Sequence, residues 1–400
     1  MRGLSNSERA AIGAIDAGAM RTNVERWSAV NSGTRNLAGL AALAGLLGEA
    51  FAVLPGAIGW VDPIAVEGVG ADGIACGIDH GPHLHLRVRP DAAVRILLTG
   101  HMDTVYPADH SFQQVTDRGD GTIGGPGVAD MKGGLAVMLA ALGALEFAGS
   151  DIGYDVLINS DEETGSLSSA ALLAEAAAGK VAALTYEPAL ADGTLAGARG
   201  GTGNFSIVVR GTSAHAGRNP EDGRNAIVAA ADLAVRLAKI AGPRLAVNPA
   251  RIEGGGPNNV VPDLAVLRIN FRPATLDEIT RARSHIDAAV AMVAADHDVG
   301  IEMHGGFNRP PKPIDPDAEK LFALVREAGG DLGLDIGWRA TGGVCDGNNI
   351  AAAGVPVVDT MGVRGGAIHS PDEFMIVDSL AERAALSAVT ILRIAERGGL

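Results

Sequence analysis

The sequence predicts an α/β protein in which a discontinuous domain, with a mostly parallel central sheet flanked by helices, is interrupted by a smaller α+β domain. Short β-branched runs at 94–100 and 155–159, bounded by turn residues, are typical of buried strands in a parallel sheet. The helical segment 132–147 lies between them and supplies the strand–helix–strand order of such a sheet. The middle of the chain alternates polar and apolar residues instead, which is typical of half-exposed antiparallel strands.

We expect the larger domain to comprise residues 1–198 and 313–400, and the inserted domain residues 199–312. The segment Pro310-Pro311-Lys312-Pro313 marks the expected return hinge. The inserted domain is predicted to hold two antiparallel strands and two amphipathic helices, at 200–211, 265–272, 223–241 and 276–295. After the hinge, a helix, a strand and a second helix are predicted at 317–328, 355–360 and 377–395.

Composition and charge narrow the class of partner. The formal net charge is −15, from 32 basic and 47 acidic residues, and no basic block stands out, so nucleic acid and anionic membrane are not expected as partners. Only Cys76 and Cys345 are present, which is neither a disulfide framework nor a cysteine zinc site. The N-terminus does not resemble a secretory leader and no apolar run is long enough to cross a bilayer, so the expected location is the cytoplasm.

Three consecutive carboxylates, Asp161-Glu162-Glu163, follow the apolar strand at 155–159. Like charges packed together raise one another's pKa unless a cation lies among them. A divalent metal removes that conflict, because one carboxylate can bind it while a neighbour stays free to move protons. Taken alone, the run is more typical of a solvated acidic turn.

Further candidate ligands follow other predicted strands or stand in polar loops. His101-Met102-Asp103 comes directly after the strand at 94–100, where residues i and i+2 point to the same side and a carboxylate can anchor the second ring nitrogen of a metal-binding histidine. Asp130 stands in a glycine-rich loop before a helix, where an N-cap is the simpler interpretation. Glu187 follows another apolar run, and His369 lies in a polar turn near the C-terminus.

Together these residues form a set of nitrogen and oxygen ligands. Ligands at the carboxyl ends of strands in an open α/β sheet converge on one crevice. Two histidines and three carboxylates, one of them bridging, suit two zinc-like ions, and the absence of thiolates disfavours a closed structural zinc site. An open, hydrolytic two-metal site is therefore predicted, with the five ligands His101, Asp130, Glu163, Glu187 and His369.

Three more histidines, at 80, 83 and 85, offer a competing cluster. The alternation His-Leu-His-Leu-Arg-Val-Arg over 83–89 instead predicts a half-exposed strand with its polar residues on one face. We therefore do not expect these histidines to bind metal.

The order of these motifs resembles the co-catalytic zinc hydrolases, a superfamily that includes glutamate carboxypeptidase, acetylornithine deacetylase, succinyl-diaminopimelate desuccinylase and aminoacylase. The resemblance covers nearly the whole chain and is closest to the glutamate carboxypeptidase branch. It rests on Gly-His101-Met-Asp-Thr-Val, Gly-x-x-Asp130-Met-Lys-Gly-Gly, Asp-Glu162-Glu163-Thr-Gly-Ser, His369-Ser-Pro-Asp-Glu and the early Val30-Asn-Ser-Gly-Thr.

The resemblance implies a role for each motif residue. Asp130 bridges two metals, His101 and Glu187 complete one site, and Glu163 and His369 complete the other. Glu162 is not a ligand but the general base that takes a proton from the metal-bound water, and Asp103 orients His101. The resemblance also implies a cis peptide bond after Asp130. The implied metals are two Zn²⁺, with Co²⁺ or Mn²⁺ also suited to such ligands.

The inserted domain resembles the lid and dimerisation domain of the same superfamily. His215 of a partner subunit would stabilise the oxyanion, which implies a homodimer, and Asn259 and Arg272 match lid positions that hold the substrate carboxylate. The counterpart of Arg309 either binds substrate or packs at the interface.

Two loops of the larger domain carry the remaining candidates for the substrate pocket. Gly343 belongs to a loop that lines the pocket in relatives, where Cys345 is either a small apolar replacement or a thiol near the metals; we favour the first. Arg364 either reaches a polar substrate group or lies on the rim.

The predicted function is that of a zinc-dependent amide hydrolase which acts on an N-acyl amino acid or a C-terminal residue with a free carboxylate. Glu187, rather than Asp, at its ligand position modestly supports a carboxypeptidase or deacylase. The same site would also suit a dipeptidase, an aminoacylase or a hydrolase of an unusual amide or aryl amine. From a different class, a metal-binding dimeric scaffold is the alternative, and the loss of Glu162 or of a ligand would have favoured it.

Overall fold

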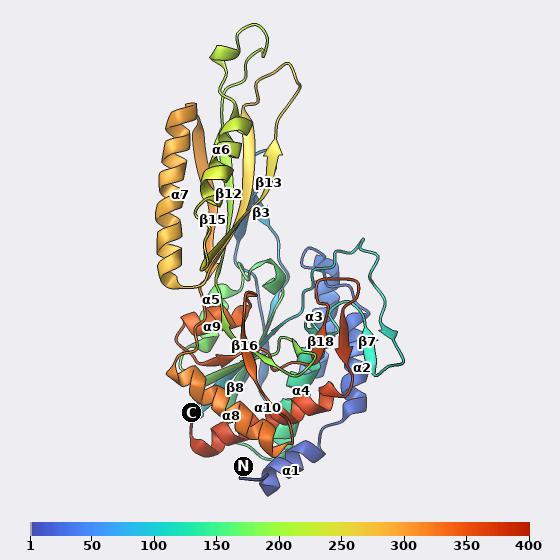
Figure 1. Ribbon diagram of the computed structural model, residues 1–400. Coiled ribbons are helices and arrows are strands. Elements are labelled where there is room, and N and C mark those ends of the chain that lie inside the picture. The colour runs from blue at the N-terminus through green and yellow to red at the C-terminus, as the bar shows by residue number, and fades with distance from the viewer. Residues whose placement is uncertain (1) are drawn as a thin grey trace.

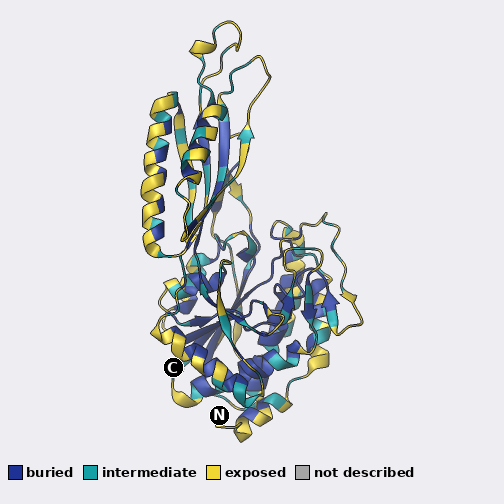
Figure 2. Cartoon of the chain, viewed as in Figure 1, coloured by how far each residue is buried: buried dark blue, intermediate teal, exposed yellow. Residues whose placement is uncertain are grey.

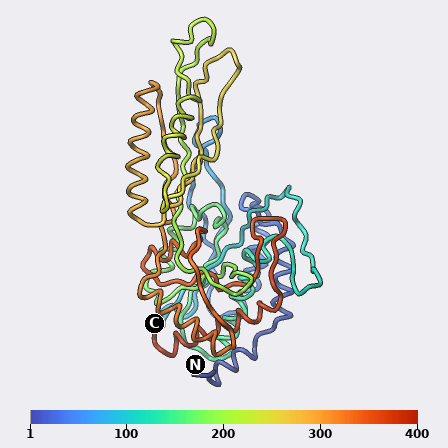
Figure 3. The backbone as a smooth tube through the Cα atoms, viewed as in Figure 1, coloured from blue at the N-terminus to red at the C-terminus, as the bar shows by residue number. Residues whose placement is uncertain are grey.

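The computed structural model describes residues 2–400 and shows an α/β domain from which a narrow second domain projects (Figure 1). Both ends of the chain lie on the first domain, and the chain enters the projecting domain and later returns from it (Figure 3). The mixed α/β class predicted from the sequence is confirmed, whereas the boundaries at 199 and 312 stay a prediction. We call the projecting part the lid.

The central sheet brings the candidate ligands to one edge. Its six strands lie in the order β1 (Ala57–Val61), β4 (His83–Val88), β8 (Gly153–Asn159), β5 (Arg95–His101), β9 (Ala182–Thr185) and β17 (Val357–Val358). Pairing is parallel from β8 to β17 and antiparallel at β1 and β4. The register sets His101 beside Asn159, and Thr99 beside Thr185, so the chain leaves β5, β8 and β9 at the same edge.

Helices cover both faces of this sheet, because alternate strand residues point to opposite sides. Ile96 and Leu98 belong to the core under five helices, whereas Leu97 packs toward two shorter ones. The first group comprises α2 (Ala17–Ser28), α3 (Leu37–Phe51), α4 (Lys132–Phe147), α8 (Pro316–Asp331) and α10 (Ser379–Arg397), and the second α5 (Ala170–Ala177) and α9 (Asp346–Ala352). A further helix, α1 (Asn6–Gly13), packs on α10 and α4. The buried residues gather between these layers (Figure 2).

Two small sheets, which the sequence pattern does not predict, shape the rim of the site. One has the order β10 (Ala189–Leu190), β18 (Arg364–Gly366), β19 (Phe374–Ile376), β7 (Thr122–Gly124) and β6 (Thr116–Asp117). The turn that joins β18 to β19 carries His369. The other pairs β11 (Leu195–Arg199) with β16 (Trp338–Thr341) in parallel.

The lid contains an antiparallel four-stranded sheet with two helices packed on it. The strand order is β13 (Leu245–Gly254), β14 (Leu264–Pro273), β12 (Thr202–Arg210) and β15 (Gly300–Arg309), and the helices are α6 (Ala226–Ala238) and α7 (Leu276–His297). The predicted pair of alternating strands is confirmed as β12 and β14, which run antiparallel with Gly203 opposite Phe271. The lid has its own hydrophobic core between sheet and helices.

The lid contacts the first domain where the chain crosses between them and also at a separate hairpin. Where the chain crosses, Arg199 and Lys312 exchange two backbone hydrogen bonds of 2.9 Å. In addition, a hairpin of β2 (Val66–Val69) and β3 (Ala75–Ile78) reaches up to the lid sheet. Arg268 donates to the carbonyl oxygen of Val69 at 2.7 Å, and a small apolar cluster closes this contact. The lid therefore contacts the first domain at the chain crossings and at this hairpin.

Two local expectations were wrong. The strand at 83–88 is buried on both faces except at Arg87, because β4 lies inside the sheet between β1 and β8. Its His85 bonds Asp155 at 2.9 Å, so polar side chains there face partners and not solvent. The strand expected at 355–360 is only two residues long.

Within 2–400, no helix is long and apolar enough to cross a membrane.

Candidate active site

The five predicted ligands meet at the carboxyl edge of the parallel strands. His101 ends β5, Glu163 lies in the short 3₁₀ helix η1 (Glu162–Thr164) after β8, and Glu187 follows β9. Asp130 precedes α4, and the Asp130–Met131 peptide bond is cis, as the resemblance implied. Gly134 lets α4 approach closely, because a Cβ there would collide with the carbonyl oxygen of Tyr186, next to Glu187.

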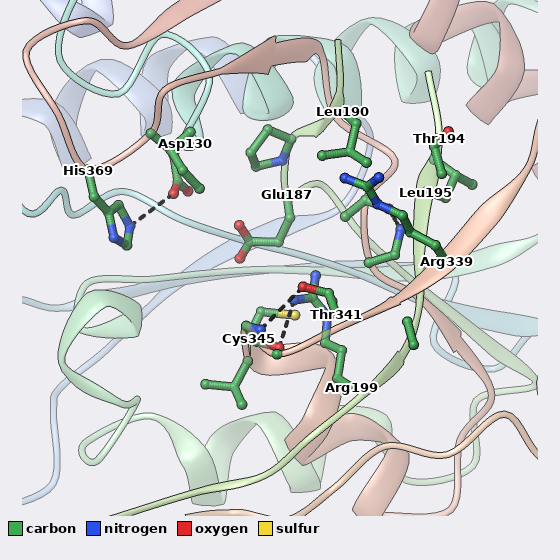
Figure 4. Close-up of a pocket in the computed structure, with 18 of the residues that line it drawn as sticks. Asp130, Glu187, Leu190, Thr194, Leu195, Arg199, Arg339, Thr341, Cys345 and His369 are labelled. Atoms are coloured by element: carbon green, nitrogen blue, oxygen red, sulfur yellow. Dashed lines mark hydrogen bonds and ion pairs between the residues drawn. The ribbon is translucent and has the colours of Figure 1, made fainter. Parts of the chain in front are cut away.

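Asp130 is shared by two groups of ligand atoms. In the first group, the His101 Nε2 atom lies 3.2 Å from Asp130 Oδ1 and 3.7 Å from Glu187 Oε1. In the second, the His369 Nε2 atom lies 3.3 Å from Asp130 Oδ2 and 3.2 Å from Glu163 Oε2. Each group offers three atoms that all lie within 4.8 Å of one another, and could therefore hold one metal ion. Figure 4 shows His369, Asp130 and Glu187 pointing into a common space.

The residues present fit a pair of divalent cations. The Oε1 atom of Glu187 is buried and has no hydrogen-bond partner, an arrangement that costs free energy unless a cation takes the place of the missing donor. The donor set is made of imidazole nitrogens and carboxylate oxygens without thiolate, which suits zinc, cobalt or manganese at an open site.

The pKa values of the ligand residues in the metal-free protein also fit a cation site. Burial raises the pKa of Glu163 to about 8, with the Asp130 charge adding to the shift, and raises the pKa of Glu187 well above its usual value. Contacts with Asp130 and Glu163 raise the pKa of His369 to about 11. These groups must give up their protons to bind a cation, so metal binding at this site releases protons and is favoured by rising pH.

Asp103 organises both sides of the site. Its Oδ1 atom lies 3.4 Å from the Nδ1 atom of His101 and accepts the backbone N–H of Glu162 at 3.1 Å. Its Oδ2 atom accepts the N–H of Glu163 and the hydroxyl of Thr34. The backbone carbonyl oxygen of Asp103 also lies 3.0 Å from His101 Nδ1, so this residue orients the His101 ring, and its carboxylate fixes the loop that presents the two glutamates.

Glu162 lies beside the ligands and is held by Arg309. Burial raises the pKa of Glu162 to about 7 against the opposing Arg309 charge. Arg309 lies within 2.8 Å of Glu162 Oε1 and also donates to the Glu162 carbonyl oxygen and to Ser166 and Asp346. The structure thus places Arg309 behind Glu162, where an ion pair with the carboxylate and a hydrogen bond to the backbone carbonyl oxygen position that residue.

Sequence reasoning missed Glu373 and Tyr106. The buried Glu373 accepts the backbone N–H groups of Ala129 and Asp130 on one oxygen, at 3.0 and 3.1 Å, and the Tyr106 hydroxyl on the other. The single hydrogen of the Tyr106 hydroxyl is shared between Glu373 and the carbonyl oxygen of Ser370, beside His369, at 2.9 and 2.8 Å. This pair joins the loop of the shared ligand to the turn of another ligand. The only sequence signal was the place of Glu373 four residues after His369.

The variant Glu373→Gln is expected to weaken metal affinity by about 10- to 100-fold, since its amide nitrogen would face a donor that the carboxylate now satisfies. Competition with a chelator measures the affinity, and circular dichroism checks that the fold is kept. Glu319→Gln, at an exposed position on α8, is the matched control and should behave as the wild type. An unchanged affinity in Glu373→Gln would contradict this positioning role.

A cavity of about 560 Å³ opens from the ligands along β11 and β16. Gly343 lines it and accepts a hydrogen bond from Arg199 at 3.1 Å, and the Nε atom of Arg199 bonds the buried Asp359 at 2.7 Å. Cys345 also lines it; burial raises the pKa of its thiol well above the usual value, so the thiol stays protonated. That protonated thiol fits the favoured interpretation of Cys345 as a small apolar replacement.

The other predicted substrate residues lie apart from this cavity. His215 and Asn259 belong to two adjoining loops, where the N–H of Ala216 donates to the Asn259 carbonyl oxygen at 2.9 Å. These loops form the tip of the lid, at the end remote from the first domain (Figure 1). Arg272 lies at the opposite end of β14, near the hinge. Burial and, to a smaller extent, the nearby Arg309 charge lower the pKa of Arg272. Arg364 is absent from the cavity lining and pairs with Glu382 at 3.2 Å.

Comparison with known proteins identifies the family of this chain. The profile of peptidase family M20/M25/M40 matches residues 97–393. The chain is 31% identical to carboxypeptidase G2 of Pseudomonas sp. (strain RS-16) over 80% of its own length and 78% of that protein. It is 29% identical to a succinyl-diaminopimelate desuccinylase of Psychrobacter sp. (strain PRwf-1), over 67% and 70% of the two chains.

Among solved structures, a tripeptidase of Staphylococcus aureus superposes with a TM-score of 0.74 at 23% identity, over 96% of this chain and all of that one, which shows the shared fold. The family match covers most of the chain and includes every one of the five metal-ligand candidates. The chain is therefore a member of peptidase family M20/M25/M40 and a hydrolytic enzyme.

Proposed function

We propose that this enzyme is a two-metal amide hydrolase that cleaves an N-acyl amino acid or a C-terminal residue, in the manner of a glutamate carboxypeptidase. The observation that carries the proposal is the pair of ligand groups that share Asp130, with the carboxylate of Glu162 enclosed beside them. The two metals, Zn²⁺ with Co²⁺ or Mn²⁺ as alternatives, would lower the pKa of a bound water and polarise the scissile carbonyl.

Glu162 is the proposed general base. Its carboxylate lines the cavity beside the two ligand groups, where it would take a proton from a bound water and pass it to the leaving nitrogen. Arg309 holds the carboxylate from one side, at 2.8 Å, and the backbone N–H of Glu162 is fixed by Asp103. Neither group occupies the cavity, so both leave room for substrate beside Glu162.

The lining of the cavity favours a carboxylate-bearing substrate over a dipeptide with a free amino group. A free α-amino group calls for an acidic anchor away from the metals. Among the lining residues that the structure describes, the acids are confined to the metal end: Asp130, Glu162, Glu163 and Glu187. Arg272 lies outside this lining, at the hinge end of β14, and among residues 2–400 its side chain hydrogen-bonds Asn270 alone, at 2.9 Å; it is the proposed anchor for the carboxylate of the amino acid.

The proposed working unit is a homodimer in which His215 of the partner subunit donates to the oxyanion. The Nδ1 atom of His215 accepts the N–H groups of Gly217 and Arg218, both at 3.1 Å, so the neutral ring carries its proton on Nε2, as an oxyanion donor needs. His215 is exposed, and the loops that carry it form the tip of the lid, at the end remote from the first domain (Figure 1). A second subunit is therefore the proposed source of the His215 that reaches each site.

Hybrid dimers test this arrangement. Glu162→Gln and His215→Ala proteins are each expected to be nearly inactive alone. When they are mixed and allowed to exchange subunits, half of the dimers are hybrids with one intact site in two, so activity should recover to about a quarter of the wild-type value. No recovery, with exchange verified by mass spectrometry, would show that His215 acts within its own chain or not at all.

The substrate class is tested by a hydrolysis screen over N-acyl amino acids, dipeptides and aroyl-glutamates, with zinc and with a chelator. Release of an amino acid from the N-acyl and aroyl compounds, abolished by the chelator, supports the proposal. Turnover of dipeptides alone would overturn it in favour of a dipeptidase.

Both cysteines are free, which suits the cytoplasm as the proposed location.

A further inference from the structure

We propose that Arg339 forms an anion-binding subsite at the far end of the active-site cavity, and that the preferred substrates carry a second carboxylate on the acyl side of the scissile amide. This inference rests on the proposed amide hydrolysis and adds the class of acyl group. No family motif of the sequence includes Arg339, and the catalytic arrangement described above does not use it.

Arg339 is held at the cavity wall by its strand. Its backbone pairs with Ala196 of β11, and the preceding Trp338 packs against Phe322 with ring centroids 4.6 Å apart. The guanidinium of Arg326 stacks on the Trp338 ring, 4.2 Å from its centroid. Figure 4 shows the Arg339 side chain projecting from β16 into the cavity toward Leu190. A fixed strand thus presents a long cationic side chain to the substrate space.

The charge of Arg339 is not neutralised within the cavity. Residues 2–400 give it no ion pair and no side-chain hydrogen bond, although it lines the same cavity as the metal ligands. The carboxylate of Asp192, in a neighbouring turn, accepts the backbone N–H of Thr194 at 2.9 Å, and this bond together with the weaker influence of the Arg339 charge lowers the pKa of Asp192. No ion pair or hydrogen bond joins the two side chains among residues 2–400. Arg199, the second arginine of the lining, differs because its Nε atom is paired with Asp359.

The surroundings of Asp359 add positive charge to the same region. Arg199 and Lys312 both contact its Oδ2 atom, at 2.7 and 3.0 Å, so two cations share one carboxylate. All four acids of the lining stand at the metal end, where two divalent cations would offset them. The far half of the cavity is therefore net positive, and an anionic group bound there gains attraction without displacing a protein partner.

The wall between the metals and Arg339 is largely apolar and includes Leu190, Leu195 and Ile368. An aliphatic chain would cover this stretch while its terminal carboxylate reaches the guanidinium. With Arg272 assigned to the carboxylate of the amino acid, the matching substrate is an amino acid acylated by a dicarboxylic acid. Such a compound bears an anion at each end and the scissile amide between them.

The experiment compares two substrates of equal size on the metal-loaded enzyme: an N-glutaryl amino acid and its counterpart with a terminal carboxamide. The wild type is expected to favour the carboxylate in kcat/KM by about 10- to 100-fold, the range of a charge-assisted hydrogen-bonded pair. Arg339→Met should reduce this preference to about twofold or less, and Arg339→Lys should keep part of it. Arg26→Met, which removes an exposed arginine on α2, is the control and should leave the preference unchanged.

A binding measurement separates this inference from the proposed function. The affinity of both compounds is measured for metal-loaded Glu162→Gln protein, with and without Arg339→Met. If both compounds are hydrolysed equally well by the wild type, the subsite is wrong and the amide hydrolase stands. If neither is hydrolysed but the carboxylate binds more tightly through Arg339, the subsite stands and the proposed reaction is wrong. Equal binding of the two compounds, or an equal loss of both in Arg339→Met, overturns the subsite.

Discussion

Glu162→Gln is expected to lower kcat by about 10²- to 10⁴-fold while the metal content stays at its wild-type value. The amide keeps the size of the side chain but cannot accept a proton. Neither ligand group includes Glu162, so the set around Asp130 is left intact. Steady-state kinetics together with elemental analysis of the dialysed protein measures the two quantities.

The matched control is Glu319→Gln, an exposed position on α8, which should alter neither kcat nor metal content. Loss of metal from Glu162→Gln in parallel with its activity would assign Glu162 to the ligand set. An unchanged kcat with full metal content would rule out the general-base role altogether. The bound metals and the base are thereby tested separately.

Asp130→Ala is expected to abolish both metal sites and to lower activity by at least about a thousandfold. Asp130 is common to both groups, whereas His369 belongs to one and His101 to the other. His369→Ala should therefore keep about one equivalent of metal, held by His101, Asp130 and Glu187. Titration with zinc and a chromophoric chelator gives the stoichiometry of each variant.

His297→Ala provides the control, because this histidine lies in the lid and pairs with Asp232 at 2.9 Å, outside both groups. It should bind two equivalents like the wild type. If Asp130→Ala still binds two equivalents, Asp130 is not shared and the two groups are separate sites. If His369→Ala loses both equivalents, the metals bind as one cooperative unit.

Much of the ligand geometry was predictable because it follows from the strands. His101, Glu163 and Glu187 come directly after buried runs, and the carboxyl ends of parallel strands meet at one edge. The exposure of the strand at 83–88 was not predictable from alternation alone. Its polar side chains find partners inside the sheet, as His85 does with Asp155, so alternation there did not mean solvent.

The positioning roles of Glu373 and Arg309 were not predicted, although Arg309 was a candidate for binding substrate, because their partners are far away in the sequence. Glu373 holds Asp130 across 243 positions, and Arg309 reaches Glu162 across 147. No local pattern encodes such a contact, since each residue alone resembles an ordinary surface glutamate or arginine.

Only the resemblance to a known family singled out Glu162 as the proposed base. The sequence by itself determined the kind of site: which side chains can bind metal, and that they belong to an α/β sheet edge. It could do so because ligand chemistry and strand period are local properties of the chain. Only the tertiary structure decided which cations face the substrate. It set Arg309 behind Glu162, paired Arg364 with Glu382, and left Arg339 in the cavity without a partner. Whether a charged side chain has a partner of opposite charge depends on how distant segments pack against each other. The net charge of the cavity is therefore set by the tertiary structure.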